Sequence, residues 1–181
     1  MRISMVGTSG SGKSTLGKAV AARLGLPFVE LDAIRHQANW VELPDPQFLA
    51  RVKEITDTEA WVIDGNYSAV RGLVRSRATQ IVWLDLPKWQ VMTQVLWRSI
   101  SRVVLRTELW NGNRERLRSL FHPEHPIWWA YSTYARRKRE YEGAIDPRWV
   151  RLRSHEEARR WLGSVPLHPV VCAAPITPVG R

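Results

Sequence analysis

Cysteine is almost absent from this sequence of 181 residues, since Cys172 is the only one. A single cysteine cannot form an internal disulfide, and no histidines and cysteines have the spacing of a zinc site. Lys or Arg also interrupts every apolar run before it reaches the ~18 residues that a membrane-spanning helix needs. The apolar stretch at residues 1–6 is too short for a signal peptide. We therefore expect a cytoplasmic protein with no membrane partner.

Acidic residues are few relative to basic ones: 17 Asp and Glu stand against 27 Lys and Arg, a formal net charge of +10. Such an excess requires an anionic partner, which can be nucleotide phosphates, nucleic acid or an acidic membrane surface. Much of the charge lies between Arg98 and Arg160, a region that also contains several tryptophans. This combination is typical of single-strand nucleic-acid binding. For most of these residues we favour a buried aromatic core with a solvated basic rim.

Short apolar runs alternate with longer amphipathic stretches, the pattern of a parallel α/β sheet. We predict strands at 2–6, 27–31, 61–63, 80–84 and 149–152, and helices at 13–24, 44–58, 88–109, 127–141 and 156–162. The length suits one domain, which we place at residues 1–163. Residues 164–181 contain four prolines, and we predict a loosely attached tail there.

The segment between the first predicted strand and helix is rich in glycine. It matches G-x-x-x-x-G-K-[ST] at every fixed position from Gly7 to Ser14. The glycines allow successive backbone N–H groups to point inward at the positive end of the helix, which creates an anion site. Lys13 is predicted to reach the β and γ phosphates, and the Ser14 hydroxyl to bind Mg²⁺. We predict ATP and Mg²⁺ as cofactors, bound by Gly7, Thr8, Ser9, Gly10, Ser11, Gly12, Lys13, Ser14 and Thr15.

The same motif serves several classes of enzyme, which further motifs distinguish. A GTPase is expected to carry an N/T-K-x-D motif that reads guanine and a D-x-x-G switch after a strand, and neither occurs in place. The chain is also short for a helicase or a motor domain. These absences favour a kinase.

Several later blocks of sequence accompany the P-loop. They are Leu31-Asp32 with Trp40, Asp64-Gly65-Asn66-Tyr67, Leu84-Asp85-Leu86-Pro87, and Arg106-Thr107-Glu108 leading to Asn111-Gly112-Asn113. Together they resemble the adenylate-kinase-like superfamily, and most closely its bacterial branch of topology-modulation or adenylate-kinase-related proteins, over residues 1–162. The resemblance implies an α/β three-layer P-loop NTPase fold with a five-stranded parallel sheet in the order 2-3-1-4-5. It also implies an acceptor-binding segment at about 32–60 and a helical lid at about 98–126.

This resemblance gives chemical roles to individual residues. Asp64 is expected to hold Mg²⁺ through its water shell, and Asp32 to bind the acceptor or accept its proton. Phosphoryl transfer needs cations around the moving group, and Arg98, Arg102 and Arg106 recur every four residues, on one face of the predicted helix. The predicted catalytic residues are Lys13, Asp32, Arg106 and Arg114. The predicted substrate-binding residues are Asp32, Trp40, Asp64, Asn66, Tyr67, Arg71, Arg102 and Arg136.

The acceptor itself stays open at the level of sequence. Adenylate kinases continue Asp-Gly with Phe-Pro-Arg, whereas Asp64-Gly65 is followed by Asn66-Tyr67 and the first arginine is Arg71. AMP is therefore not specifically indicated, and a nucleoside, another nucleotide, a sugar or an unrelated small molecule is possible. The leading hypothesis is a Mg²⁺-ATP-dependent small-molecule kinase. The alternative is a nucleotide-gated nucleic-acid-binding protein or regulatory ATPase, and the oligomeric state is open.

Overall fold

A single parallel sheet forms the centre of the molecule. The computed structural model describes residues 1–105, 107–113 and 126–167. Within them, five strands pair in the order β2-β3-β1-β4-β5, and every neighbouring pair is parallel. The predicted sheet and its order are therefore confirmed. The strands are β1 (Arg2–Gly7), β2 (Phe28–Glu30), β3 (Trp61–Asp64), β4 (Gln80–Leu84) and β5 (Trp149–Leu152).

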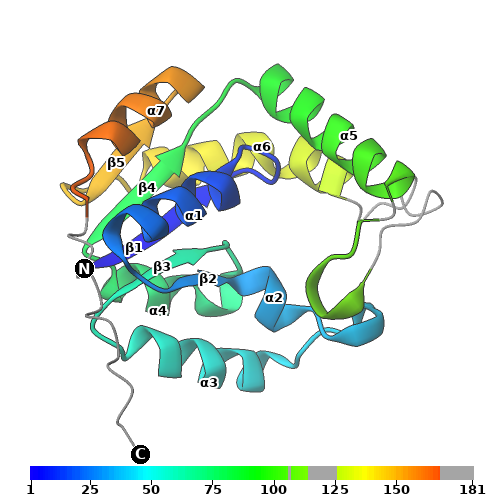
Figure 1. The fold of residues 1–181 in the computed structure, drawn as a ribbon, viewed down its shortest axis with the longest axis horizontal. Coiled ribbons are helices and arrows are strands. Elements are labelled where there is room, and N and C mark those ends of the chain that lie inside the picture. The colour runs from blue at the N-terminus through cyan, green and yellow to red at the C-terminus, as the bar shows by residue number, and fades with distance from the viewer. Residues whose placement is uncertain (106, 114–125, 168–181) are drawn as a thin grey trace, which may run out of the picture.

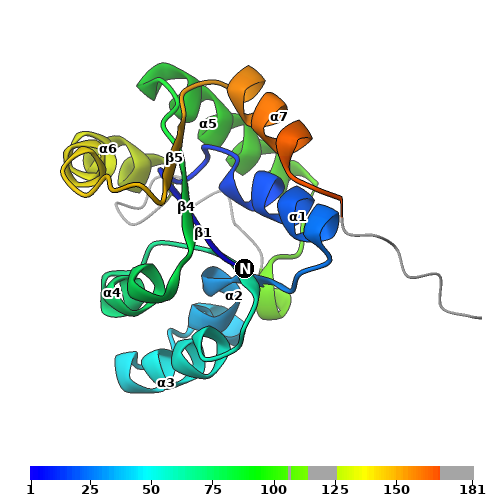
Figure 2. The same ribbon diagram turned by 90° about the vertical axis from the view of Figure 1, so that its left-hand side faces the viewer.

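Helices cover both faces of this sheet, which gives three layers (Figures 1 and 2). One face carries α1 (Lys13–Leu24) and α7 (His155–Ser164). The other carries α3 (Asp45–Thr56), α4 (Ser68–Arg77) and α6 (Pro126–Glu142). The helix α5 (Lys88–Val104) follows β4 and packs on α6. No helix among the described residues is long and apolar enough to cross a membrane.

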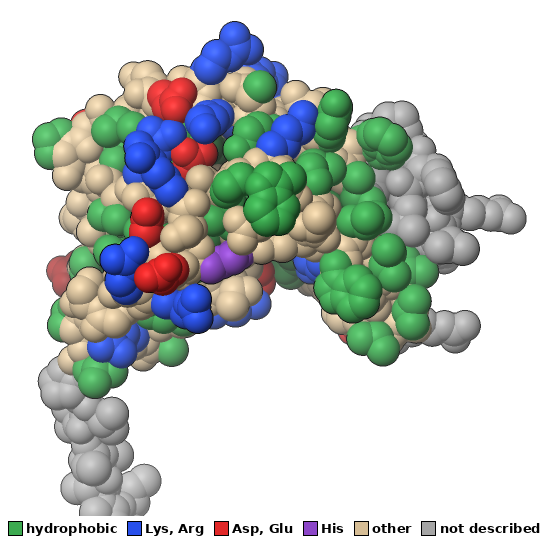
Figure 3. Space-filling view, turned by 90° about the horizontal axis from the view of Figure 1, so that it is seen from above, with side chains coloured by type: hydrophobic (Ala, Val, Ile, Leu, Met, Phe, Trp, Pro, Cys, Tyr) green, Lys and Arg blue, Asp and Glu red, His purple; other side chains and the backbone are tan. Residues whose placement is uncertain are grey.

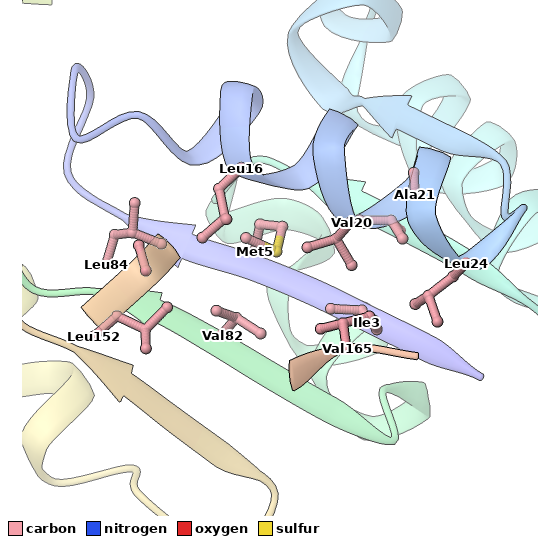
Figure 4. Close-up of a cluster of buried hydrophobic side chains, with 12 residues drawn as sticks. Ile3, Met5, Leu16, Val20, Ala21, Leu24, Val82, Leu84, Leu152 and Val165 are labelled. Carbon is pink, nitrogen blue, oxygen red and sulfur yellow. The ribbon is translucent and has the colours of Figure 1, made fainter. Parts of the chain in front are cut away.

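The core on the α1 face follows from helical spacing in the sequence. Leu16, Val20 and Leu24 recur every four residues, so they share one face of α1 and lie over Ile3 and Met5 of β1 (Figure 4). Burying each such aliphatic side chain contributes about 1.5–3 kcal/mol. Val165, just beyond α7, joins the same cluster with 7% of its surface exposed. The packed part of the chain thus reaches one residue past the start of the predicted tail, whose residues 168–181 lie outside the described ones.

Aromatic side chains fill the core on the opposite face. Trp61 and Trp83 are almost fully buried there together with Phe48 and Tyr141. Trp83 meets Tyr141 edge to face, with ring centroids 5.3 Å apart. Part of the unusual tryptophan content is therefore ordinary core. Trp89, on the outer side of α5, is instead 70% exposed.

Two local features differ from the sequence prediction. The helix α4 was not predicted, because only Val70 and Val74 mark its buried side. The helix α5 ends at Val104 instead of 109, and the chain then turns so that the Thr107 N–H donates to the Arg102 carbonyl at 3.0 Å. Arg106 lies outside the described residues, so its place on a common helix face with Arg98 and Arg102 stays a prediction.

A further difference concerns Asp32. A short helix, α2 (Leu31–Arg35), begins directly after β2. Asp32 consequently lies in the first turn of α2 and not at the end of a strand. It remains at the carboxyl edge of the sheet, because β2 ends one residue before α2 starts.

Candidate active site

The carboxyl ends of β1, β3 and β2 meet at one edge of the sheet. The register places Asp64 at the end of β3, beside Met5 of β1 on one side and Glu30 of β2 on the other. The chain leaves β1 at Gly7 and enters α1 at Lys13. The glycine-rich loop and two strand-end carboxylates therefore share the position where open α/β sheets bind ligands.

The loop needs its glycines for two separate reasons. Gly10 and Gly12 have φ angles of 82° and 92°, in the left-handed region that other residues adopt only with strain. Space is the second reason, since a Cβ on Gly10 would lie 2.0 Å from Cγ2 of Val95 in α5. The packing of α5 against the loop thus leaves room for backbone only.

Lys13 lies at the centre of the charges in this region. Its Nζ donates to the Thr8 carbonyl at 3.1 Å, within the loop. Desolvation lowers the pKa of Lys13, and the nearby negative charges of Asp64 and Asp32 oppose this shift. The nearby cations Arg137 and Arg98 lower the pKa of Lys13 further. The carboxylates only partly offset the positive charge of these cations. Such a region is suited to bind phosphates.

Ser14 and Asp64 form a direct pair. The Ser14 hydroxyl donates to Oδ2 of Asp64 at 2.5 Å. Asp64 is 6% exposed, and burial raises its pKa, with Lys13 and Ser14 partly offsetting that effect. Its other oxygen, Oδ1, is buried without a hydrogen-bond partner among the described residues. Hydroxyl and carboxylate oxygens are ligands that Mg²⁺ prefers, and a hydrated cation would satisfy the unpaired oxygen, so these residues fit the metal.

Asp32, the second carboxylate that acts on Lys13, is held by aromatic residues. The Tyr67 hydroxyl donates to Oδ1 of Asp32 at 2.7 Å, and it lies 3.2 Å from Nε2 of His36. The Tyr67 ring meets Phe48 edge to face at 5.2 Å. Burial and the charge of Asp32 raise the pKa of Tyr67, so the hydroxyl remains protonated. His36 was not among the predicted site residues.

The segment 107–113 closes onto the same region. Trp110 stacks on the His36 ring at 6.2 Å, and Trp40 meets that ring from another side at 5.6 Å. Asn113 is 4% exposed; its Oδ1 accepts from the Trp40 N–H at 2.9 Å and its Nδ2 donates to the Gln37 carbonyl at 2.8 Å. This part of the predicted lid is therefore tied to the predicted acceptor segment.

The arginines separate into those that face the loop and those that stabilise the fold. Arg98 donates to the Ser9 hydroxyl at 3.3 Å, so it reaches the loop from α5. Arg71 pairs with Glu140 of α6 at 2.5 Å and borders a small pocket with Asn66 and Tyr67. Asn66 itself donates to the Tyr141 hydroxyl.

Two neighbouring arginines of α6 differ in burial. Arg136, the predicted residue, is exposed, whereas Arg137 is half-buried, and burial lowers its pKa. Arg137 continues the buried face of α6 formed by Ala130, Thr133 and Tyr141, a spacing of 3 and 4 residues that is visible in the sequence. Arg102 lies in the last turn of α5, while Arg106 and Arg114 lie outside the described residues.

Known proteins match this chain at the level of family model and fold. A family model described as shikimate kinase matches residues 9–54, which include Lys13 and Asp32. No curated protein sequence matches the chain.

Solved structures of similar fold include three bacterial kinases. Shikimate kinase from Acinetobacter baumannii in complex with shikimate has a TM-score of 0.58 and 19% identity, over 91% of this chain and 89% of that one. Shikimate kinase from Bacteroides thetaiotaomicron has a TM-score of 0.53 and 17% identity, over 90% and 94%. A gluconokinase from Sinorhizobium meliloti 1021 has a TM-score of 0.51 and 21% identity, over 90% and 91%. The chain thus has the fold of P-loop kinases, whose shikimate kinase type uses ATP and Mg²⁺.

Proposed function

We propose that this protein is a Mg²⁺-ATP-dependent kinase that transfers the γ-phosphoryl group of ATP to a hydroxyl of a small molecule. The observation that carries the proposal is the arrangement around Lys13. The Ser14–Asp64 pair and the Asp32–Tyr67 pair both lie close to it, because both carboxylates act on the charge of Lys13. A pair suited to hold Mg²⁺ and a carboxylate suited to accept a proton therefore lie near the same cation.

The chemistry needs one proton transfer and one exchange of bonds at phosphorus. Asp32 accepts the proton of the acceptor hydroxyl as its oxygen forms a bond to the γ phosphorus. The bond between that phosphorus and the β–γ bridging oxygen breaks, and ADP leaves. Lys13, Arg98 and Arg137 oppose the negative charge that spreads over the oxygens in the transition state. Ser14 and Asp64 would hold Mg²⁺, which when bound neutralises phosphate charge.

The acceptor that we propose is a small hydroxylated compound of the shikimate or sugar-acid type. The support is the shikimate kinase family model, which covers Asp32, together with the shikimate kinase and gluconokinase folds. Arg71 lines the small pocket that Tyr67 also lines, and Arg137 lies near Arg71, so this region carries positive charge that suits an anionic acceptor. A nucleoside or nucleotide acceptor and the resemblance to topology-modulation proteins stay predictions.

A transfer assay tests this function. The purified protein is incubated with Mg²⁺-ATP and a panel of shikimate, sugar acids, sugars, nucleosides and nucleoside monophosphates, and phosphorylated products are detected by ³¹P NMR. We expect one class of acceptor to be phosphorylated, and Lys13→Met and Asp32→Asn to lose transfer. Slow ATP hydrolysis with no phosphorylated acceptor would contradict the proposal.

The alternative is a nucleotide-gated nucleic-acid-binding protein, favoured by the formal charge of +10. In Figure 3, however, the Lys and Arg side chains on the visible face are interspersed with Asp and Glu, and hydrophobic side chains cover much of the rest. A 50-residue single-stranded oligonucleotide tests the idea, because such binding weakens steeply with added salt. Failure to bind at low salt would exclude it.

A further inference from the structure

Asp32, Tyr67 and His36 form a chain of hydrogen-bonding groups at the acceptor side of the site. Asp32 lies in the first turn of α2 and His36 caps its C-terminus, while Tyr67 caps the N-terminus of α4. The Tyr67 hydroxyl is the central member, 2.7 Å from Oδ1 of Asp32 and 3.2 Å from Nε2 of His36. Two separate elements thus converge on one carboxylate.

The direction of each hydrogen bond follows from the protonation of Tyr67. A hydroxyl has one proton to donate, and beside an acceptor-only carboxylate this proton goes to Asp32. The Tyr67 oxygen can then only accept from His36, so Nε2 must carry the imidazole proton. In the neutral ring this leaves Nδ1 without a proton. Consistent with this, Nδ1 is buried and makes no hydrogen bond among the described residues.

Packing restricts both supporting side chains. The Tyr67 ring lies against Phe48, which is fully buried, and the His36 ring contacts both Trp40 and Trp110. The backbone of α2 adds a further constraint, because the His36 N–H donates to the Asp32 carbonyl at 3.0 Å. These contacts therefore restrict the rotation of the Tyr67 and His36 side chains.

We propose that Tyr67 and His36 are positioning residues that fix the Asp32 carboxylate for proton acceptance from the acceptor. The inference rests on the proposed kinase function, in which Asp32 is the base. Tyr67 occupies Oδ1, so Oδ2 is the oxygen that would accept the proton of the acceptor hydroxyl. A carboxylate held in one rotamer reacts faster than one that samples several, because catalysis depends on sub-ångström placement.

Kinetics test the positioning role. Tyr67→Phe keeps the ring and its contact with Phe48, and we expect it to lower kcat for phosphoryl transfer about 10- to 100-fold while leaving KM for ATP unchanged. Tyr134→Phe is the matched control, because the Tyr134 hydroxyl donates to the Leu86 carbonyl at 2.8 Å outside this chain of groups. For His36, Gln retains a donor and is expected to preserve more kcat than Leu. A Tyr67→Phe enzyme with the kcat of the wild type overturns the proposal.

Nitrogen NMR tests the hydrogen-bond chain without any acceptor. In ¹⁵N-labelled protein at pH 8, the His36 ring is expected to show protonated Nε2 and unprotonated Nδ1. His36→Gln assigns the signal, and Tyr67→Phe is expected to shift it. A ring protonated at Nδ1 overturns the chain. If the wild type phosphorylates no acceptor, the proposed function fails. The tautomer of His36 still tests the hydrogen-bond chain, because this measurement does not depend on kinase activity.

Discussion

Gly10 shows how a single residue can be required by both conformation and space. Its φ of 82° and the contact of a would-be Cβ with Val95 both oppose any side chain. We expect Gly10→Ala to lower the free energy of unfolding by about 1–3 kcal/mol and to weaken nucleotide binding at least tenfold. Thermal denaturation and nucleotide titration measure the two effects.

Gly72 provides the control for Gly10. It lies within α4, and a Cβ there would meet no atom within 4 Å. Gly72→Ala is therefore expected to stabilise the protein by about 0.5–1 kcal/mol and leave nucleotide binding unchanged. Equal effects of the two substitutions would refute the claim that the loop specifically requires glycine at position 10.

The Ser14–Asp64 pair gives a second prediction at the residue scale. Ser14→Ala and Asp64→Asn each remove an oxygen ligand suited to Mg²⁺, so we expect kcat/KM to fall about 10²- to 10³-fold and the Mg²⁺ requirement to rise. A Mg²⁺ titration of the transfer rate measures both. Ser76→Ala is the control, because its hydroxyl only donates to the Leu73 carbonyl on the surface of α4. An unchanged Mg²⁺ requirement in both site variants would count against the metal site.

The residues of the loop could be predicted because their pattern is local and strict. Gly7 to Ser14 needs no knowledge of distant segments. Arg136 was chosen from a run of basic residues, although the spacing of 3 and 4 residues from Ala130 through Thr133 indicates that Arg137 continues the buried face of α6. His36 was missed because its partner Tyr67 is 31 residues away.

At the scale of elements, helix ends were the least predictable feature. Apolar residues continue past Val104 to Leu105 and Leu109, so periodicity alone extends α5 too far. The true end is set by tertiary contacts, because Asn111 donates to carbonyls of Ala33 and His36 in the acceptor segment. The strands, in contrast, are short β-branched runs that remain recognisable without their neighbours.

Asn113 connects two elements, which gives a third prediction. Its buried side chain bonds the backbone of Trp40, Gln37 and Trp110. Asn113→Ala is expected to cost about 1–3 kcal/mol of stability because these partners lose their bonds, and to raise KM for the acceptor more than KM for ATP. Hydrogen exchange should increase over residues 36–41. An equal rise of both KM values would contradict a specific role in the acceptor segment.

The link between α3 and α4 predicts a pH dependence. Hydrogen bonds from Lys53 and Arg77 lower the pKa of Asp57 below its ordinary value of 3.8. A carboxylate with a lowered folded-state pKa stabilises the fold above the unfolded pKa and loses this effect as the pH falls through the folded pKa. Asp57→Asn is thus expected to melt slightly below the wild type at pH 7, and the difference should close below pH 3.8.

Glu59 supplies the control for Asp57. Its carboxylate forms no ion pair among the described residues, so Glu59→Gln should melt like the wild type at every pH. Melting temperatures of the three proteins over a pH series provide the measurement. A difference between Asp57→Asn and wild type that persists under acid would show another cause.

At the scale of the whole molecule, the strand order could not be derived from the residues alone. Alternation of strands and helices indicates a parallel sheet, but β1 lies between β3 and β4 through contacts far apart in sequence. The order came from the resemblance to adenylate-kinase-like proteins. The predicted lid over residues 114–125 and the catalytic role of Arg114 stay predictions.

Ligand binding should stabilise the entire fold. A non-hydrolysable ATP analogue at 100 times its Kd is expected to add about 2.7 kcal/mol, or about 5–10 °C in Tm for a chain of this size. The Tm increase should shrink when EDTA removes Mg²⁺, and should disappear in Lys13→Met. Thermal shift measures it, and an increase that survives in Lys13→Met would mean that the nucleotide binds elsewhere.

The two indole rings beside His36 allow acceptor binding to be followed by intrinsic fluorescence. Trp40 and Trp110 flank the acceptor side, and Trp40 is 42% exposed, whereas Trp61 and Trp83 are sealed in the core. An acceptor that displaces water from the first pair should change the emission of those rings and leave the buried pair as a constant background. Replacing Trp40 and Trp110 with Phe one at a time would assign the signal, and candidate compounds could then be ranked by fluorescence before any turnover is detected.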